Sequence, residues 1–172
     1  MKVLGVDPGL NITGYGLVES GASGTKMVEA GVIRTSSEEH IAQRLKTIYE
    51  GLAGIIEEYR PEILVLEKVY SHYKHPATAI LMAHARGVAC LLCGIYGVEL
   101  VNYASTHLKR SISGRGRASK SQVAGMVKSV LKLKSLPAFH DATDALALAI
   151  CHVDSIAREK AACGASKEGS LP

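Results

Sequence analysis

Two aspartates lie three residues apart in the stretch HDATDALALAI, residues 140–150, which otherwise has the apolar character of a buried helix. At that spacing Asp141 and Asp144 share one side of a helix, where their like charges repel each other. One alternative is structural, because acids in the first turn complement the positive end of a helix and Asp is a good N-cap. That role accounts for one aspartate better than for both, since the neighbours of Asp144, such as Ala145 and Leu148, are apolar. The other alternative is that the pair binds a metal ion.

Two further acids each end a short apolar stretch typical of a β-strand. Asp7 follows KVLGV and precedes Pro-Gly, and Glu67 follows ILVL. Taken alone, Asp7 has a simpler interpretation as a turn former and Glu67 as a surface carboxylate. If the two strands are neighbours, however, both carboxylates emerge at the same edge of the sheet, where sheets of this class bind ligands.

Convergence of the four acids at one place predicts a site for divalent cations. Carboxylates close together repel each other and raise one another's pKa. Divalent cations prefer hard oxygen ligands and neutralise such a cluster. Two such ions about 4 Å apart activate water and stabilise the leaving oxygen of a phosphodiester. The chemistry that these residue types favour is therefore metal-assisted hydrolysis.

The cysteines do not point to zinc. The chain has Cys90, Cys93, Cys151 and Cys163, and the first two form a C-x-x-C inside the apolar stretch RGVACLLCGIYG. No second ligand pair follows at zinc spacing. A reduced pair packed in the core is therefore favoured over a zinc or redox site.

Positive charge is concentrated in one part of the chain. Residues 100–140 contain eight basic residues and no acid: Lys109, Arg110, Arg115, Arg117, Lys120, Lys128, Lys132 and Lys134. The whole chain has 20 basic and 16 acidic residues, so the remainder has 12 basic and 16 acidic residues. A block of one sign indicates a polyanionic partner such as nucleic acid. The alternative is a solvated helix face followed by a loop.

Length and composition are those of one globular domain. The chain of 172 residues is long enough for one domain with a real core and short for two, and 47% of its residues are hydrophobic. We find no apolar run of about eighteen residues, so we expect no membrane span. The N-terminal MKVLGVDPG leads directly into a strand and lacks the apolar segment of a signal peptide, so we expect a cytoplasmic protein.

The elements that position the acids begin with strands. Residues 2–7 form an apolar strand that ends at a Pro-Gly turn, and residues 12–20 and 26–35 predict an antiparallel meander. A helix follows over 41–59, since apolar side chains recur at helical spacing: Ile41, Leu45, Ile48, Leu52, Ile55, Ile56 and Tyr59. Arg60-Pro61 ends this helix.

The next part of the chain alternates strands and helices. Residues 63–66 predict a strand buried on both faces, and residues 98–103 predict another. The intervening segment 77–96 is a helix that is apolar nearly all round, which predicts burial on two sides, in the core and against another subunit. Residues 111–118 are rich in Gly and Arg, and we predict no regular structure there.

Two helices complete the prediction. One is amphipathic and lies around residues 123–131, and the last covers residues 141–158. The order β-β-β-α-β-α-β-α-α describes a single α/β domain over residues 1–158, with helices packed on a mixed sheet. Residues 159–172 are expected to form a disordered C-terminal tail.

Five segments, in this order, resemble the RuvC family of crossover junction endodeoxyribonucleases, or Holliday junction resolvases. They are GVDPGLNITGYG at 5–16, LEKVY at 66–70, ARGVA at 85–89, GRGRASKSQV at 114–123 and DATDALALAI at 141–150. The resemblance covers residues 2 to 155, and five collinear motifs are far more specific than one.

The resemblance implies an RNase H-like fold of the retroviral integrase superfamily, with a five-stranded mixed sheet flanked by helices. It implies a homodimer that binds four-way junctions during DNA recombination and repair, with the RuvA–RuvB branch-migration complex as a partner. Symmetric nicks in two strands of like polarity then leave 5′-phosphate and 3′-hydroxyl ends. The implied cofactor is Mg²⁺, two ions per active site, with Mn²⁺ as a substitute.

The catalytic acids of the family fall on Asp7, Glu67, Asp141 and Asp144. On this hypothesis one ion is held by Asp7 and Asp144 and the other by Asp7 and Glu67, while Asp141 acts as a ligand or a base. Some members have His where Asp141 aligns, and His140 stands one position earlier. The spacing to Asp144 assigns the role to Asp141, with His140 as a neighbour that supports metal or water.

The DNA-binding residues of the family fall on Tyr70, Lys109 and Lys120. Tyr70 corresponds to an aromatic residue thought to stack on an unpaired base, although a tyrosine there also suits the lining of a groove. Lys109 and Lys120 lie in the acid-free block, which we expect to contact phosphates rather than bases. Arg115 and Arg117 lie in the Gly-rich loop and are either DNA contacts or solvated.

Three other functions are alternatives to a resolvase. An actin-like or sugar-kinase ATPase also has an Asp-x-Gly turn after its first strand, but it needs two such domains, which 172 residues cannot supply. A junction-binding module without cleavage has no reason to keep a carboxylate cluster. A relative with the same fold that acts on RNA, such as the YqgF group, is disfavoured by the acid-free block and the complete DATDALA motif.

Overall fold

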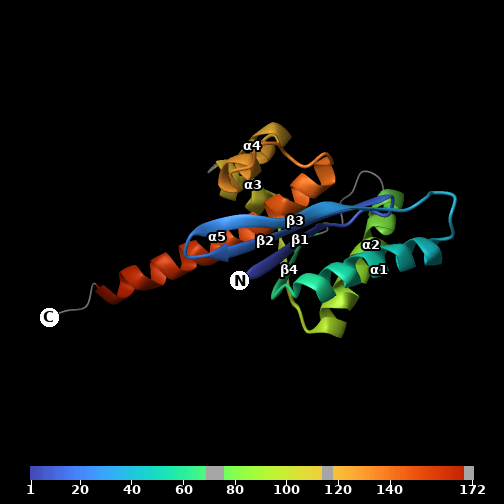
Figure 1. Cartoon of the computed structure of the whole chain (residues 1–172), viewed down its shortest axis with the longest axis horizontal. Helices are drawn as coiled ribbons and strands as arrows, with labels where there is room; N and C mark the ends of the chain where they lie inside the picture. Colours follow the sequence, from blue (N-terminus) through green and yellow to red (C-terminus); the bar gives the residue numbers. More distant parts are fainter. Residues whose placement is uncertain (69–75, 114–117, 169–172) are drawn as a thin grey trace.

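A five-stranded mixed sheet forms the centre of the computed structural model, which describes residues 1–68, 76–113 and 118–168 (Figure 1). Its strands are β1 (Lys2–Asp7), β2 (Ile12–Gly21), β3 (Gly24–Arg34), β4 (Ile63–Glu67) and β5 (Glu99–Tyr103), in the order β3-β2-β1-β4-β5. Strand β2 pairs antiparallel with β1 and β3, whereas β4 pairs parallel with β1 and β5. The predicted fold class is confirmed.

Helices cover both faces of the sheet because its central strands are apolar on both sides. Helices α1 (Ile41–Tyr59) and α2 (Pro76–Tyr96) lie on one side in Figure 1, and α3 (Ser105–Ser113) and α4 (Lys120–Val130) lie on the other, together with α5 (His140–Glu168). Alternate strand residues point to opposite faces. Leu4 and Leu64 accordingly belong to the core cluster with α1 and α2, while Val3 and Val65 belong to the cluster with α4 and α5.

Helix α5 lies directly on β1 and β2 because glycines leave that part of the sheet without side chains. A Cβ atom on Gly5 would lie 1.9 Å from the carbonyl oxygen of Ala145, and one on Gly14 would lie 2.2 Å from the carbonyl oxygen of Asp141. A Cβ atom on Gly16 would lie 2.6 Å from the side-chain Cγ and 2.7 Å from the backbone nitrogen of Leu146. Only glycine fits such close approaches of backbone to backbone. These contacts fix the start of α5 over the sheet.

Helix α3 was not predicted. Its nine residues carry too few apolar side chains for a helical period to stand out in the sequence. Leu108 packs against the core cluster on that face, and the ring nitrogen Nδ1 of His107 lies 3.5 Å from the sulfur of Cys151 on α5. Contacts distant in sequence therefore stabilise this helix. Part of the segment predicted to lack regular structure, residues 114–117, is outside the described residues.

Helix α5 also differs from the prediction, because it continues past Arg158 and ends at Glu168. The buried pattern stops near Ile156, and the prediction followed that pattern. Residues 159–168, expected in a disordered tail, are helical here, and the Ala, Glu and Lys residues in this sequence have high helix propensity. Figure 1 shows this last part of α5 extending past the sheet.

Helix α2 is covered on one side only. Ala85 and Ala89 are buried, whereas Ile80, Leu91 and Ile95 on the outer side are 58%, 57% and 54% exposed. By length and composition alone Thr78–Tyr96 is apolar enough to cross a membrane, and 22% of this window is buried inside the chain. Core helices of soluble proteins share that composition. Within the single chain, α2 is therefore buried on its core side, and the predicted burial against another subunit stays a prediction.

The C-x-x-C pair lies on α2, with Cys93 buried and Cys90 half-buried, and both are free cysteines. Burial, together with the neighbouring Cys90, raises the pKa of Cys93 to about 11. Cys93 is therefore a neutral thiol at physiological pH. The predicted role in core packing is confirmed.

Candidate active site

The ends of β1 and β4 place two carboxylates side by side. The two strands pair in parallel with Val6 opposite Leu66, the residues immediately before Asp7 and Glu67. Because both strands run in the same direction, the two acids leave the sheet at the same edge. The condition that the two strands are neighbours is therefore met.

Helix α5 brings a third carboxylate to this edge, and α4 brings an amine. Asp7, Glu67, Lys120 and Asp144 line one hollow of about 430 Å³. Its other lining residues are Ser105, Leu108, Ala118, Val123 and Leu148. Three acids from three elements thus share one site with the amine of a lysine, and the rest of the lining is largely apolar.

The acids at this edge are electrostatically coupled. Burial raises the pKa of Asp7 to about 7, and the carboxylates of Asp144, Asp141 and Glu67 add to the increase, while Lys120 opposes it. Burial also raises the pKa of Asp144, with Lys120 opposing the shift and Asp141 adding to it. Such shifts are typical of carboxylates that are held together away from bulk water.

This donor set suits a hard divalent cation. Carboxylate oxygens are the ligands that Mg²⁺ and Mn²⁺ prefer, and a cation among these acids removes the repulsion that raises the pKa of Asp7. Within the described residues, no three His, Cys, Asp or Glu side chains are already gathered at metal-binding geometry. Asp7, Glu67 and Asp144, which line the same hollow, are the residues that would hold such an ion.

Asp141 differs from the other three acids in its position. It lines a separate hollow with residues 9–12 and with Thr78, Leu81 and Met82 of α2. Helical spacing predicts Asp141 and Asp144 together, but the start of α5 has these two acids on different hollows. Asp141 still contributes to the pKa of Asp7 through its charge. His140 is the exposed first residue of α5, and its charge acts on Asp144.

Lys120 is the one predicted DNA-binding residue whose side chain the structure describes. It begins α4, directly after the N-cap residue Ser119. The Ser119 hydroxyl accepts a hydrogen bond from the backbone N–H of Gln122 at 3.3 Å, and the Gln122 side chain accepts one from the backbone N–H of Ser119 at 2.8 Å. This capping box fixes the helix start, and with it the backbone position of Lys120.

The other predicted DNA-binding residues are not placed. Tyr70, Arg115 and Arg117 lie outside the described residues, and Lys109 is on α3 but its side chain is outside the described part of the chain.

Two features of the site were not predicted. Ser105 lines the hollow, and no motif singled it out. Arg86 lies in the quoted ARGVA segment and bonds to the backbone of Glu67. A lone arginine in an apolar helix was the signal that could have found it.

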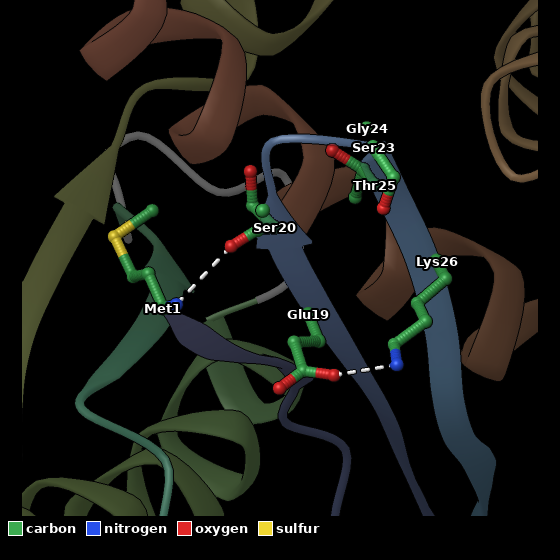
Figure 2. A pocket seen from close by; sticks show the side chains of 8 residues that line it. Met1, Glu19, Ser20, Ser23, Gly24, Thr25 and Lys26 are labelled. Atoms are coloured by element: carbon green, nitrogen blue, oxygen red, sulfur yellow. Dashed lines mark hydrogen bonds and ion pairs between the residues drawn. The ribbon is translucent and has the colours of Figure 1, made fainter.

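A second hollow, of about 320 Å³, lies at the opposite end of β1 and is lined by residues that include Met1, Glu19, Ser20 and Lys26 (Figure 2). Its charged groups are paired within the protein. Lys26 contacts Glu19 at 2.8 Å, and the N-terminal ammonium donates to the carbonyl of Ser20 at 3.1 Å. Among its described lining residues, this hollow lacks the convergent acids found at the carboxyl ends of β1 and β4.

Comparisons with known proteins place the chain in one family. The family model described as Crossover junction endodeoxyribonuclease RuvC matches residues 3–152. The chain is 43% identical to the enzyme of that description from Halorhodospira halophila over 151 residues, which covers 88% of this chain and 89% of that protein. It is 44% identical to the one from Hydrogenovibrio crunogenus over 151 residues, with 88% and 86% covered.

A solved structure shares the fold of nearly the whole chain. It is Thermus thermophilus RuvC in complex with a Holliday junction substrate, with a TM-score of 0.85 and 30% identity, covering 91% of this chain and 94% of that chain. The family match, the two relatives and this structure all extend over most of the chain, and the family match includes Asp7, Glu67 and Asp144. The chain therefore belongs to the RuvC family of crossover junction endodeoxyribonucleases.

Proposed function

We propose that this protein is a Holliday junction resolvase, a metal-dependent endonuclease that nicks two strands of like polarity in a four-way DNA junction. The observation that carries the proposal is the shared hollow of Asp7, Glu67, Asp144 and Lys120 at the carboxyl ends of parallel strands. Acids that hold cations beside a basic side chain fit the hydrolysis of a phosphodiester. A relative of the same family was solved with a Holliday junction as its substrate.

In this proposal Asp7, Glu67 and Asp144 hold two Mg²⁺ ions, and Mn²⁺ substitutes for them. When bound, the ions activate water and stabilise the departing 3′-oxygen, which leaves 5′-phosphate and 3′-hydroxyl ends. Asp7 would contribute to both ion sites, because Glu67 and Asp144 line the same hollow with it. Asp141 acts from its separate hollow as an additional ligand or base, with His140 beside it.

Lys120 has a different role in this proposal, as a contact to the phosphate that is cleaved. Its amine is the basic group that lines the hollow, and its charge limits the rise in the pKa of both Asp7 and Asp144. Lys120 therefore favours the ionised acids that a metal requires while it binds the DNA backbone. Lys109, Arg115 and Arg117 extend this contact along phosphates, and Tyr70 stacks on an unpaired base.

Symmetric nicking requires two active sites, so we propose a homodimer. The open outer face of α2, formed by Ile80, Leu91 and Ile95, is the apolar surface that a second copy would cover. We also propose that the protein acts in the cytoplasm in DNA recombination and repair, with the RuvA–RuvB complex as its partner.

The decisive experiment uses a mobile four-way junction with Mg²⁺ and maps the nicks on each strand. We expect paired nicks at equivalent positions in two strands of like polarity, and ends that ligase can join. Linear duplex DNA and a structured RNA are the matched substrates, and EDTA is the metal control. Binding without nicks, or preferential cutting of the RNA, would contradict the proposal.

A further inference from the structure

Arg86 of α2 forms a bridge between the ends of two strands. Its Nη1 group donates a hydrogen bond to the backbone carbonyl of Glu67 at 2.6 Å, and its Nη2 group donates to the side-chain oxygen of Asn102. Glu67 is the last residue of β4, and Asn102 is the penultimate residue of β5. The planar guanidinium can hold two acceptors in fixed relative positions, which an ammonium group cannot do.

The bridge lies where the parallel ladder between β4 and β5 ends. Leu66 pairs with Asn102 and Glu67 pairs with Tyr103, and the N–H of Lys68 donates to the carbonyl of Tyr103 at 2.7 Å. A hydrogen bond to the carbonyl of Glu67 restrains the peptide plane between residues 67 and 68. The backbone of Glu67 sets the direction of its Cα–Cβ bond, so this restraint helps to direct the side chain that lines the hollow.

The placement of a charge at this point of α2 is otherwise unfavourable. Arg86 is the single Lys or Arg in the sequence of α2, it is half-buried, and its neighbours Ala85 and Ala89 are buried against the core. Removing a guanidinium from water has a cost, which its two hydrogen bonds offset.

We propose that Arg86 is a positioning residue for Glu67, which keeps the Glu67 carboxylate directed toward Asp7 for metal binding. Arg86 acts through the backbone of Glu67 and makes no contact with DNA in this role. The inference rests on the proposed function and adds to it a residue that ties α2 to the site.

The test compares Arg86→Gln and Arg86→Lys with the wild type. We expect Arg86→Gln to cleave a four-way junction about 10- to 100-fold more slowly at saturating DNA, with weaker Mn²⁺ binding in a metal titration followed by electron paramagnetic resonance. Arg86→Lys keeps the charge but cannot bridge both acceptors, so we expect an intermediate loss. The affinity for the junction, measured in Ca²⁺ or EDTA, should stay within about twofold of the wild type, because no phosphate contact is removed.

Arg158→Gln is the control, since this arginine also donates to a backbone carbonyl, that of Ser111 at 3.4 Å, away from the acids. It should leave the cleavage rate and Mn²⁺ binding unchanged. A folded Arg86→Gln variant with wild-type rate and Mn²⁺ affinity would overturn the inference, as would a loss confined to thermal stability. If Arg86→Gln does not fold, Asn102→Ala decides, with a smaller loss in the same direction expected. Failure of the wild type to cut junctions would contradict the proposed function, and the Mn²⁺ titration would still decide the role of Arg86.

Discussion

Asp144 is, after burial, the largest cause of the raised pKa of Asp7, ahead of Asp141 and Glu67. The two aspartates come from opposite ends of the sequence, one at the end of β1 and the other in the first turns of α5. Their coupling is a direct result of the way α5 lies on the sheet. It also makes the site sensitive to pH.

The pKa of Asp7 predicts how stability changes with pH in the absence of divalent cations. Its value in the folded protein is about 7 and its ordinary value is 3.8, so the folded state holds this proton more tightly than the unfolded state does. The contribution of Asp7 to stability is therefore largest below pH 3.8 and is lost as the pH rises to about 7. In EDTA, the free energy of unfolding of Asp7→Asn minus that of the wild type should increase by about 2 kcal/mol when the pH is raised from about 5 to about 8. Chemical denaturation at the two pH values measures this, and parallel pH curves would contradict it.

The positions of the acids predict unequal effects of their removal. Asp7→Asn, Glu67→Gln and Asp144→Asn should each lower junction cleavage about a thousandfold, since several kcal/mol of charge stabilisation is lost with a metal ligand. Asp141→Asn should cost less, about tenfold, because Asp141 lines a different hollow. All four variants should still bind the junction, since loss of a negative charge does not weaken phosphate contacts. Single-turnover rates with Mg²⁺ test the order, and wild-type cutting by Asp7→Asn or Glu67→Gln would refute it.

Removal of the Lys120 amine should affect both binding and cleavage. We expect Lys120→Ala to bind the junction more weakly and to reduce the slope of log affinity against log salt concentration by about 1. Lys46 is a suitable control, because it is exposed on α1 and paired with Glu50 at 3.0 Å, on the other side of the sheet. Lys46→Ala should leave the slope unchanged. Equal slopes for Lys120→Ala and the wild type would remove Lys120 from the DNA interface.

The contact between Gly5 and α5 predicts a strong effect of a single methyl group. Gly5→Ala should lower the free energy of unfolding by about 3 kcal/mol, because the new Cβ atom would lie 1.9 Å from the Ala145 oxygen. Gly54 on α1 has open space around its Cβ position, and Gly54→Ala should instead stabilise the protein by about 0.5–1 kcal/mol. Urea denaturation distinguishes the two, and equal stabilities would show that α5 can move away from β1.

The open face of α2 predicts the oligomeric state. Light scattering should give twice the chain mass of 18.2 kDa for the wild type. A charge on that face, as in Leu91→Glu, should reduce the mass to that of one chain, since Leu91 is 57% exposed within the single chain. Met27→Glu, at a 37% exposed position on β3, is the control and should stay a dimer. A wild-type mass equal to one chain would exclude the dimer.

Much of this site could be predicted because local patterns determine it. The helix over 41–59 and the strand that ends at Glu67 follow from strong apolar periodicity and from a short apolar run, and the structure has both. The acids at strand ends needed one further assumption, that β1 and β4 are neighbours. Five collinear motifs supported that assumption through a known family.

The remaining features depend on contacts between residues far apart in sequence. Helix α3 is stabilised by Leu108 in the core and by the contact of His107 with Cys151 on α5, which no local pattern reports. That Asp141 and Asp144 line different hollows depends on how α5 lies on the sheet, where the backbone of Asp141 closely approaches Gly14. Helical spacing gives the angle between two side chains around the helix axis. It does not give the direction of either side chain relative to the sheet.

The glycines beneath α5 also restrict how such a site can be altered. Gly5 and Gly14 allow α5 to lie close to the sheet because they have no side chain. No small substitution at these positions can therefore make a small change in the position of the acids. A side chain at either position would push α5 away from the sheet by about the width of a methyl group. Asp141 and Asp144 would then move together, because both lie on α5. We therefore expect substitutions that change metal preference or substrate to occur on the other wall of the hollow, around Ser105 and Lys120. Side chains there can change without moving α5 away from the sheet.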